Sequence, residues 1–409
     1  MHGARVSAPL RGNPPFRRYL LAGLISSAGT AMATGAVAFA VLRLGHGASG
    51  VAMVALGQTG ATVLMLPVGG TLADRFSRVR VIVVAQLVIG SLVALQACLV
   101  AAERAQVAQL ALIAAAVSVA RAFSSPARFG LVGDLVPAEQ APEANSLAKL
   151  AQTGVDVFGP AVGGVVVAAA GPSVGIGVNA LSFVLSALLM RGVRAPPARA
   201  RGRTFRSDVR EGWRVVSRTP WIAWKVLGSA VVVSCWQVSY AIAGLTYVQQ
   251  RLGGPAAWGV VASCLGIGTV AGAVLALVWT PRRAGQAGGA ALLPLALPGL
   301  CMGCGAPLPL IAGTVVFAAM GLTVAAVTWR SLVQQKIPES QQGRVAAWVQ
   351  LGETGLAPLA FLLVDPAVGR LGLQGALLLC AGGLAAAAVA PLAHPDVRRL
   401  RLAPRPSQG

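Results

Sequence analysis

Arg121, Asp156 and Glu353 are ionisable residues that stand inside long apolar runs of this chain. An unpaired charge at the centre of a bilayer costs about 3 kcal/mol or more, so such residues call for a reason. A carboxyl group in a low-dielectric setting can carry a proton near neutral pH. It can equally form a structural ion pair with an arginine, and Arg121 is the obvious partner for Asp156. The sequence leaves both roles open for Asp156 and Glu353.

The runs around these residues are long enough to be membrane helices. Residues 51–68 and 81–102 carry no charge, and about 20 apolar helical residues span a hydrocarbon core. Hydrophobic residues make up 56% of the chain and charged residues 11%, against about 25% charged in a soluble domain. The net charge of +21 does not predict nucleic-acid binding, because the basic residues stand in short segments between apolar runs. The composition predicts a multi-pass protein embedded in a lipid bilayer.

Twelve apolar runs predict an all-α membrane protein with two six-helix halves. We expect an N-terminal half over residues 1–190, a basic cytoplasmic linker over 191–220, a C-terminal half over 221–393 and a basic tail over 394–409. A surface helix is expected within the linker, at 207–216. The predicted spans are 19–42, 51–72, 80–102, 106–125, 147–170, 175–190, 221–249, 256–279, 287–305, 308–329, 345–364 and 373–392.

The distribution of positive charge predicts the orientation. Four arginines lie in the loops that this topology places outside, and the other 29 of the 33 Lys and Arg lie inside or near inner helix ends. Short cytoplasmic loops carry an excess of Lys and Arg. Both termini are therefore expected in the cytoplasm. The four outside residues are Arg43, Arg104, Arg251 and Arg370.

The loop between the second and third runs reads Gly69-Gly-Thr-Leu-Ala-Asp-Arg-Phe-Ser-Arg-Val-Arg80. It resembles the loop between helices 2 and 3 of the major facilitator superfamily, with Ser77 where the usual pattern has glycine. The resemblance implies a cytoplasmic gate that closes against helix 11, formed by Gly70, Asp74, Arg75 and Arg78. The sequence offers a mechanism, in which Asp74 meets the N-terminus of helix 11 near 342–344. The alternative is a basic turn that only orients the helices.

An internal repeat supports two halves. Residues 126–137 after helix 4 and 329–338 after helix 10 both read Arg, then Leu-Val, a polar or charged residue and Pro. An acidic residue precedes a proline by about one turn in each following helix: Asp156 before Pro160, and Glu353 before Pro358. We predict two related halves, as in the parallel repeats of this superfamily.

Helix 5 carries the run Asp156-Val-Phe-Gly-Pro-Ala-Val-Gly-Gly164. It resembles the Gly-Pro-x-x-Gly-Gly motif of exporters in the superfamily, and the chain is most similar to the branch of siderophore exporters and macrolide-efflux proteins. Glycines at this spacing leave a bare face that permits close helix packing, and proline lets the helix bend. We expect Gly159, Gly163 and Gly164 to face glycine-rich helix 8. A plain packing face without an export role is the alternative for Gly159, Pro160, Gly163 and Gly164.

Polar and aromatic residues near mid-membrane are the candidates for a substrate cavity, although packing alone also explains each of them. A mostly apolar cavity with few acids suits a lipophilic, neutral or weakly basic compound. The low aromatic content of 5% gives no sign of a dense stacking cage. The candidates are Thr30, Thr34, Gln58, Trp236, Gln237 and Tyr240.

These observations predict a secondary transporter of the cell membrane that exports a small organic molecule, such as a drug, antibiotic or siderophore-like metabolite. We expect a monomer that works by alternating access and is driven by the proton gradient. No Gly-x-x-x-x-Gly-Lys-Ser/Thr loop is present, and no cofactor or metal site is expected. An importer on the same fold is the first alternative. A non-transport membrane protein, such as an enzyme, is the second, but the deep acids have no histidine near them.

Overall fold

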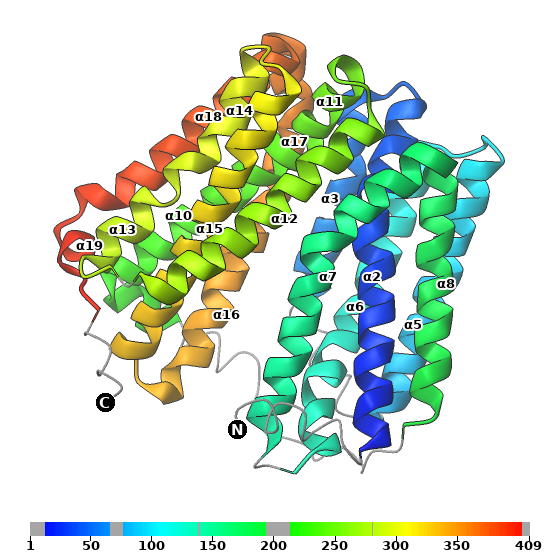
Figure 1. Cartoon of the computed structure of the whole chain (residues 1–409), viewed down its shortest axis with the longest axis horizontal. Helices are drawn as coiled ribbons and strands as arrows, with labels where there is room; N and C mark the ends of the chain where they lie inside the picture. Colours follow the sequence, from blue (N-terminus) through cyan, green and yellow to red (C-terminus); the bar gives the residue numbers. More distant parts are fainter. Residues whose placement is uncertain (1–12, 66–76, 138–139, 194–212, 280, 403–409) are drawn as a thin grey trace. The chain divides into compact units, whose positions relative to one another are not determined.

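A computed structural model of the chain describes residues 13–65, 77–137, 140–193, 213–279 and 281–402. Every regular element in these ranges is a helix, as the sequence predicted. The helices form two compact units, 1–46 with 53–202 and 47–52 with 203–409 (Figure 1). The predicted surface helix at 207–216 lies mostly outside the described residues, although residues 213–218 are helical.

The first unit is built around α2, which packs on both α7 and α8. α5 packs on α6 and α8, and Gly57 of α3 lies against Ala111 of α6. The helices are α2 (Pro14–Arg43), α3 (Gly47–Met65), α5 (Arg78–Ala101), α6 (Val107–Leu135), α7 (Ala141–Ala170) and α8 (Pro172–Arg191).

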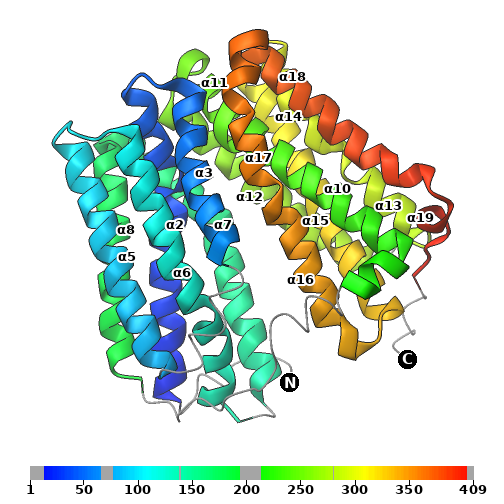
Figure 2. The same ribbon diagram turned by 180° about the vertical axis from the view of Figure 1, so that it is seen from behind.

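The second unit repeats this pattern of packing with interrupted helices. α10 packs on α16 and α18, α14 packs on α15 and α18, and α12 packs on α15 (Figure 2). These are the pairs that the predicted repeat requires, since they correspond to the contacts of α2, α5 and α3 in the first unit. The elements are α10 (Pro220–Trp236), the π-helix η2 (Gln237–Gly244), α11 (Leu245–Arg251), α12 (Pro255–Val278), α13 (Ala284–Ala290), the 3-10 helix η3 (Leu293–Leu295), α14 (Ala296–Gly303), α15 (Leu308–Lys336), α16 (Glu339–Gly355), α17 (Ala357–Leu362), α18 (Val364–Ala393) and α19 (Pro395–Arg399).

The two segments predicted as loops after helices 4 and 10 are helical. α6 continues to Leu135 and α15 to Lys336. Each helix ends where the residue before a proline becomes extended: Val136 has φ −126° and Ile337 has φ −112°. A proline disfavours the helical conformation of the residue before it. The proline that the two segments share therefore marks the end of a helix in each unit.

Eleven helices among the described residues are long and apolar enough to cross a membrane. The predicted span 345–364 is not one of them. The helix there begins at Glu339 and is divided at Leu356, just ahead of Pro358, into the two shorter helices α16 and α17. The predicted loop before the last span is also helical, and α18 contains a break at Gly372, whose φ is +70°. A positive φ suits glycine, which has no Cβ. The exact count of twelve stays a prediction.

Large apolar side chains remain exposed on the outer faces of both units. Leu112 is 71% exposed and Val278 is 80% exposed. A soluble protein rarely leaves so much contiguous apolar surface in water. Within the first unit, Phe16, Ile82 and Leu131 are instead fully buried and form part of its core. The exposed faces fit contact with lipid.

Candidate functional site

The first unit forms a partly open cavity of about 430 Å³, lined by both polar and apolar side chains. This volume lies in the range of small-molecule sites, about 300–1,000 Å³. Five helices contribute side chains, α2, α5, α6, α7 and α8. The lining residues are Ser26, Ser27, Thr30, Ala31, Thr34, Gln86, Ile89, Arg121, Ser124, Ser125, Arg128, Gln152, Asp156, Pro160 and Phe183.

Arg121 of α6 is held against α2 and α8. Its Nη2 donates a hydrogen bond to the Thr30 hydroxyl oxygen at 3.1 Å, and its guanidinium lies 5.6 Å from the centre of the Phe183 ring. The ring face attracts the cation. The Nε of Arg121 is buried and has no hydrogen-bond partner among the described residues. The arginine therefore keeps an unused donor inside the unit.

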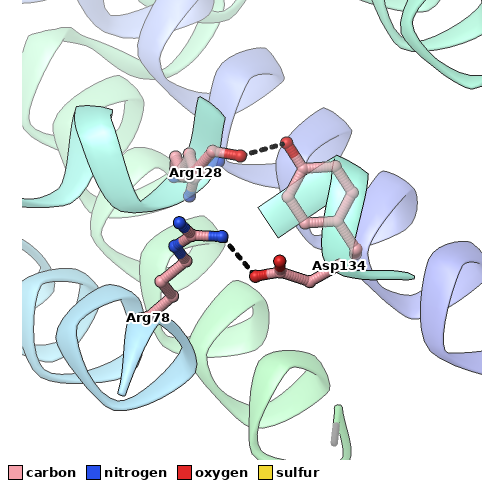
Figure 3. A network of polar contacts seen from close by, with 4 residues as sticks. Arg78, Arg128 and Asp134 are labelled. Atoms are coloured by element: carbon pink, nitrogen blue, oxygen red, sulfur yellow. Dashed lines mark hydrogen bonds and ion pairs between the residues drawn. The ribbon is translucent and has the colours of Figure 1, made fainter. Parts of the chain in front are cut away.

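Arg128 brings a second guanidinium to the same cavity, about two helical turns further along α6. Its Nη2 lies 3.5 Å from the Ser26 hydroxyl, which is a weak contact. The guanidinium also lies beside Gly23, where an added Cβ would be 3.8 Å from Nη1. The Arg128 carbonyl accepts a hydrogen bond from the Tyr19 hydroxyl at 3.2 Å (Figure 3). The backbone of Arg128 is thus held by Tyr19, whereas its guanidinium makes only a long hydrogen bond to Ser26.

Asp156 lines this cavity from α7 but does not form the predicted ion pair with Arg121. Its carboxylate accepts a hydrogen bond from Gln152 Nε2 at 2.7 Å, one turn away on α7. No ion pair joins Asp156 to either arginine within the described part of the chain. Thr30 and Phe183 instead hold Arg121 toward α2 and α8.

The neutral polar groups of the cavity are bonded to the scaffold. Gln86 Nε2 donates to Ser186 Oγ at 2.7 Å, and Ser186 Oγ donates to the Ala22 carbonyl at 2.8 Å. This chain of bonds ties α5 and α8 to α2. Thr34, a predicted cavity residue, lines the cavity and donates to the Thr30 carbonyl at 2.9 Å.

The predicted gate is described only in part. Gly70, Asp74 and Arg75 lie outside the described residues. Arg78 begins α5 and is ion-paired with Asp134 in the last turn of α6 (Figure 3). The sequence did not predict this pair, because Asp134 was placed in a loop.

Gly159 and Gly163 of the helix 5 motif pack on α2 within the first unit. A Cβ at Gly159 would lie 2.4 Å from the Ala31 Cβ, and one at Gly163 would lie 2.1 Å from the Met32 carbonyl oxygen. Gly164 is buried beside them, and Pro160 lines the cavity. The predicted partner, α12, turns Gly268 and Gly272 toward α15 of its own unit. The close packing expected of these glycines is therefore made with α2, whereas the expected contact with helix 8 would join the two units and stays a prediction.

Two of the predicted cavity aromatics form a cluster in the second unit. The Trp236 and Tyr240 rings stack with centres 5.0 Å apart, and Trp258 lies 4.7 Å from Tyr240. The π-helix that begins at Gln237 contains Tyr240, and π-helical turns often mark functional sites. The sequence analysis named Trp236 and Tyr240 but did not predict that they would stack with each other and with Trp258. Gln58 of α3 is exposed and is not among the residues that line the cavity.

Glu353 lies near a lysine rather than an arginine. Its Oε1 is 4.0 Å from Lys225 Nζ on α10, and Lys225 lies 5.9 Å from the centre of the Trp329 ring. The sequence interpretation overlooked Lys225, Arg128 and Gln86. A single cation inside an apolar run was the available signal for Lys225, as it was for Arg121.

A bundle of apolar helices, with the same packing in two units and a partly polar cavity in one of them, is the architecture of a membrane transporter. The chain belongs to the Major Facilitator Superfamily, whose family model matches residues 19–362. The chain is therefore a multi-pass membrane protein of a transporter family.

A curated relative is similar over much of the chain. It is the uncharacterized MFS-type transporter YfiS of Bacillus subtilis (strain 168), 27% identical over 311 residues, which is 70% of each chain.

Solved structures share the fold. A bacterial homologue of the iron transporter ferroportin, in an inward-facing state, has a TM-score of 0.71 and 19% identity, covering 94% of this chain and 99% of that chain. The nucleoside transporter NupG has a TM-score of 0.70 and 11% identity, covering 93% and 98%. At these identities the likeness shows the fold alone.

Proposed function

We propose that this protein is a secondary active transporter that exports a small organic molecule by alternating access between its two halves. Membership of the superfamily supports transport. The observation that carries the proposal is the partly polar cavity of about 430 Å³ among membrane-spanning helices of the first unit. The motif from Asp156 to Gly164 supports export, since it borders this cavity through Asp156 and Pro160.

The proton gradient is the proposed energy source. Asp156 is the acidic residue of the cavity, and its described partner is the neutral amide of Gln152. A carboxylate without a cationic partner can take up a proton without stranding an opposite charge. Proton uptake by Asp156 would also change the charge of the cavity during the cycle.

The proposed setting is the cell membrane, with both termini in the cytoplasm, the linker at 191–220 between the halves and the chain acting as a monomer. The orientation follows from the distribution of Lys and Arg. Siderophore-like metabolites, drugs and antibiotics are the substrates first to be tested, since the sequence resembles exporters of such compounds.

The test measures growth and transport in a host that lacks its own major pumps. Expression should raise resistance to one or more compounds of a panel. Everted membrane vesicles should accumulate the same compound when the interior is made acidic, and an uncoupler should abolish this. Asp156→Asn should lose the accumulation, with Asp156→Glu as the conservative control. Accumulation by intact cells would instead identify an importer.

A further inference from the structure

We propose that the cavity of the first unit binds an acidic group of the transported molecule, a carboxylate or a phosphate, between Arg121 and Arg128. This inference rests on the proposed transport function and specifies its substrate class: an organic acid with an apolar part.

The first step concerns charge. Arg121 and Arg128 both line the cavity, and Asp156 is the acidic residue among its lining residues. Guanidinium groups stay protonated in proteins, so these three side chains leave an excess of one positive charge. Asp156 does not neutralise either arginine by direct contact, because its carboxylate accepts its hydrogen bond from Gln152. A cationic substrate would be repelled, which argues against the weakly basic compound that the sequence suggested.

The second step concerns hydrogen-bond donors. Five of the six hydroxyls that line the cavity already donate to backbone carbonyls at 2.8–3.2 Å. The amides of Gln86 and Gln152 donate to Ser186 and Asp156. The donors in question are those of Ser26, Thr30, Thr34, Ser124 and Ser125.

The charged donors that stay unused belong to the arginines. Each guanidinium has five N–H donors. Arg121 gives one to Thr30, and its Nε is buried without a partner. A buried donor without a partner has lost its hydrogen bonds to water, and this loss is largest when the donor is charged. An oxyanion that enters the cavity offsets this loss, because arginine can bind carboxylates and phosphates through two parallel hydrogen bonds.

The third step concerns the rest of the ligand. Ala31, Ile89, Pro160 and Phe183 give the same cavity an apolar wall. An inorganic anion would leave this wall unused, whereas the hydrocarbon part of an organic acid would cover it. The geometry thus favours an amphiphilic acid.

The experiment measures binding to the purified full-length protein in neutral detergent by calorimetry and by the rise in apparent Tm. The probes are benzoate and phenyl phosphate, with benzyl alcohol, benzylamine and inorganic phosphate for comparison. Benzoate or phenyl phosphate should bind and raise the apparent Tm, and the three comparison probes should bind more weakly. Arg121→Gln and Arg128→Gln should each weaken the binding by about tenfold or more.

Two further variants keep the test independent of folding. Arg121→Lys keeps the positive charge but cannot form two parallel hydrogen bonds to one oxyanion. It should therefore weaken phenyl phosphate binding less than Arg121→Gln does. Arg104→Gln removes an exposed arginine outside the cavity, and it should leave the affinity unchanged. If Arg121→Gln elutes as an aggregate, Arg121→Lys and Arg128→Gln decide the result.

Several outcomes overturn the proposal. They are benzylamine binding as well as benzoate, inorganic phosphate binding as tightly as phenyl phosphate, an equal loss of affinity in Arg104→Gln, and no binding of either acid at millimolar concentration. If binding depends on the arginines but no vesicle assay shows export, the proposed function is contradicted and the acid-binding site is supported. Full export by Arg121→Gln would keep the function and overturn the acid site.

Discussion

Arg78 at the start of α5 is ion-paired with Asp134 in the last turn of α6. The side chains are 18% and 24% exposed, so water screens the pair only in part. Asp134→Asn leaves the Arg78 charge with weaker compensation, and we expect a loss of about 1–3 kcal/mol, between the values for exposed and buried pairs. Thermal unfolding in detergent should show a lower apparent Tm.

The double variant Arg78→Asp/Asp134→Arg restores opposite charges and should recover part of the loss. Glu103→Gln, at an exposed position, is the matched control. An unchanged Tm in Asp134→Asn would show that the pair contributes nothing to stability.

Asp156→Asn is expected to separate stability from coupling. Because no cation pairs with Asp156 in the described structure, its neutralisation should change the free energy of unfolding by less than about 1 kcal/mol and leave the apparent Tm nearly unchanged. Transport driven by a pH gradient should be lost, while exchange of labelled for unlabelled substrate should continue. Proteoliposomes measure both activities. A fully active variant would exclude Asp156 as the proton carrier.

The sequence was sufficient for the class of fold because apolar length, positive charge and the loop motif each act locally along the chain. The sequence assigned Asp156, Thr30 and Arg121 to predicted helices 5, 1 and 4, but it did not show which of these side chains are in contact. It could not predict that Thr30 rather than Asp156 bonds Arg121, since that choice depends on the rotation of α6 relative to α2. The aromatic cluster was missed for a similar reason, because a π-helix shifts the phase of Tyr240. The gate at Asp74 stays a prediction.

Tyr240→Phe should raise stability slightly. The Tyr240 hydroxyl is buried without a hydrogen-bond partner among the described residues, whereas its ring packs between Trp236 and Trp258. Removing an unsatisfied hydroxyl should gain about 1 kcal/mol while the stacking remains. Tyr240→Ala is the comparison and should lower the apparent Tm. A lower Tm in Tyr240→Phe would reveal a partner for the hydroxyl.

Lys225 and Glu353 should show strong coupling in a double-mutant cycle. The two charges lie 4.0 Å apart, on helices of the second unit. Lys225→Met or Glu353→Gln alone leaves one charge uncompensated and should lower the apparent Tm more than the double variant does. Additive losses would show that the two residues act independently.

The final prediction compares two glycines of α7. A Cβ at Gly163 would meet the Met32 carbonyl oxygen at 2.1 Å, whereas a Cβ at Gly154 would meet nothing within 4 Å. Gly163→Ala must therefore push α7 away from α2, and we expect a large fall in the yield of folded protein. Gly154→Ala should be neutral or should stabilise α7 by up to about 1 kcal/mol, since alanine is the better helix former. Size-exclusion profiles and apparent Tm values of the two variants measure the difference. Equal behaviour would contradict the close contact of α7 with α2, and with it the packing role of the helix 5 motif.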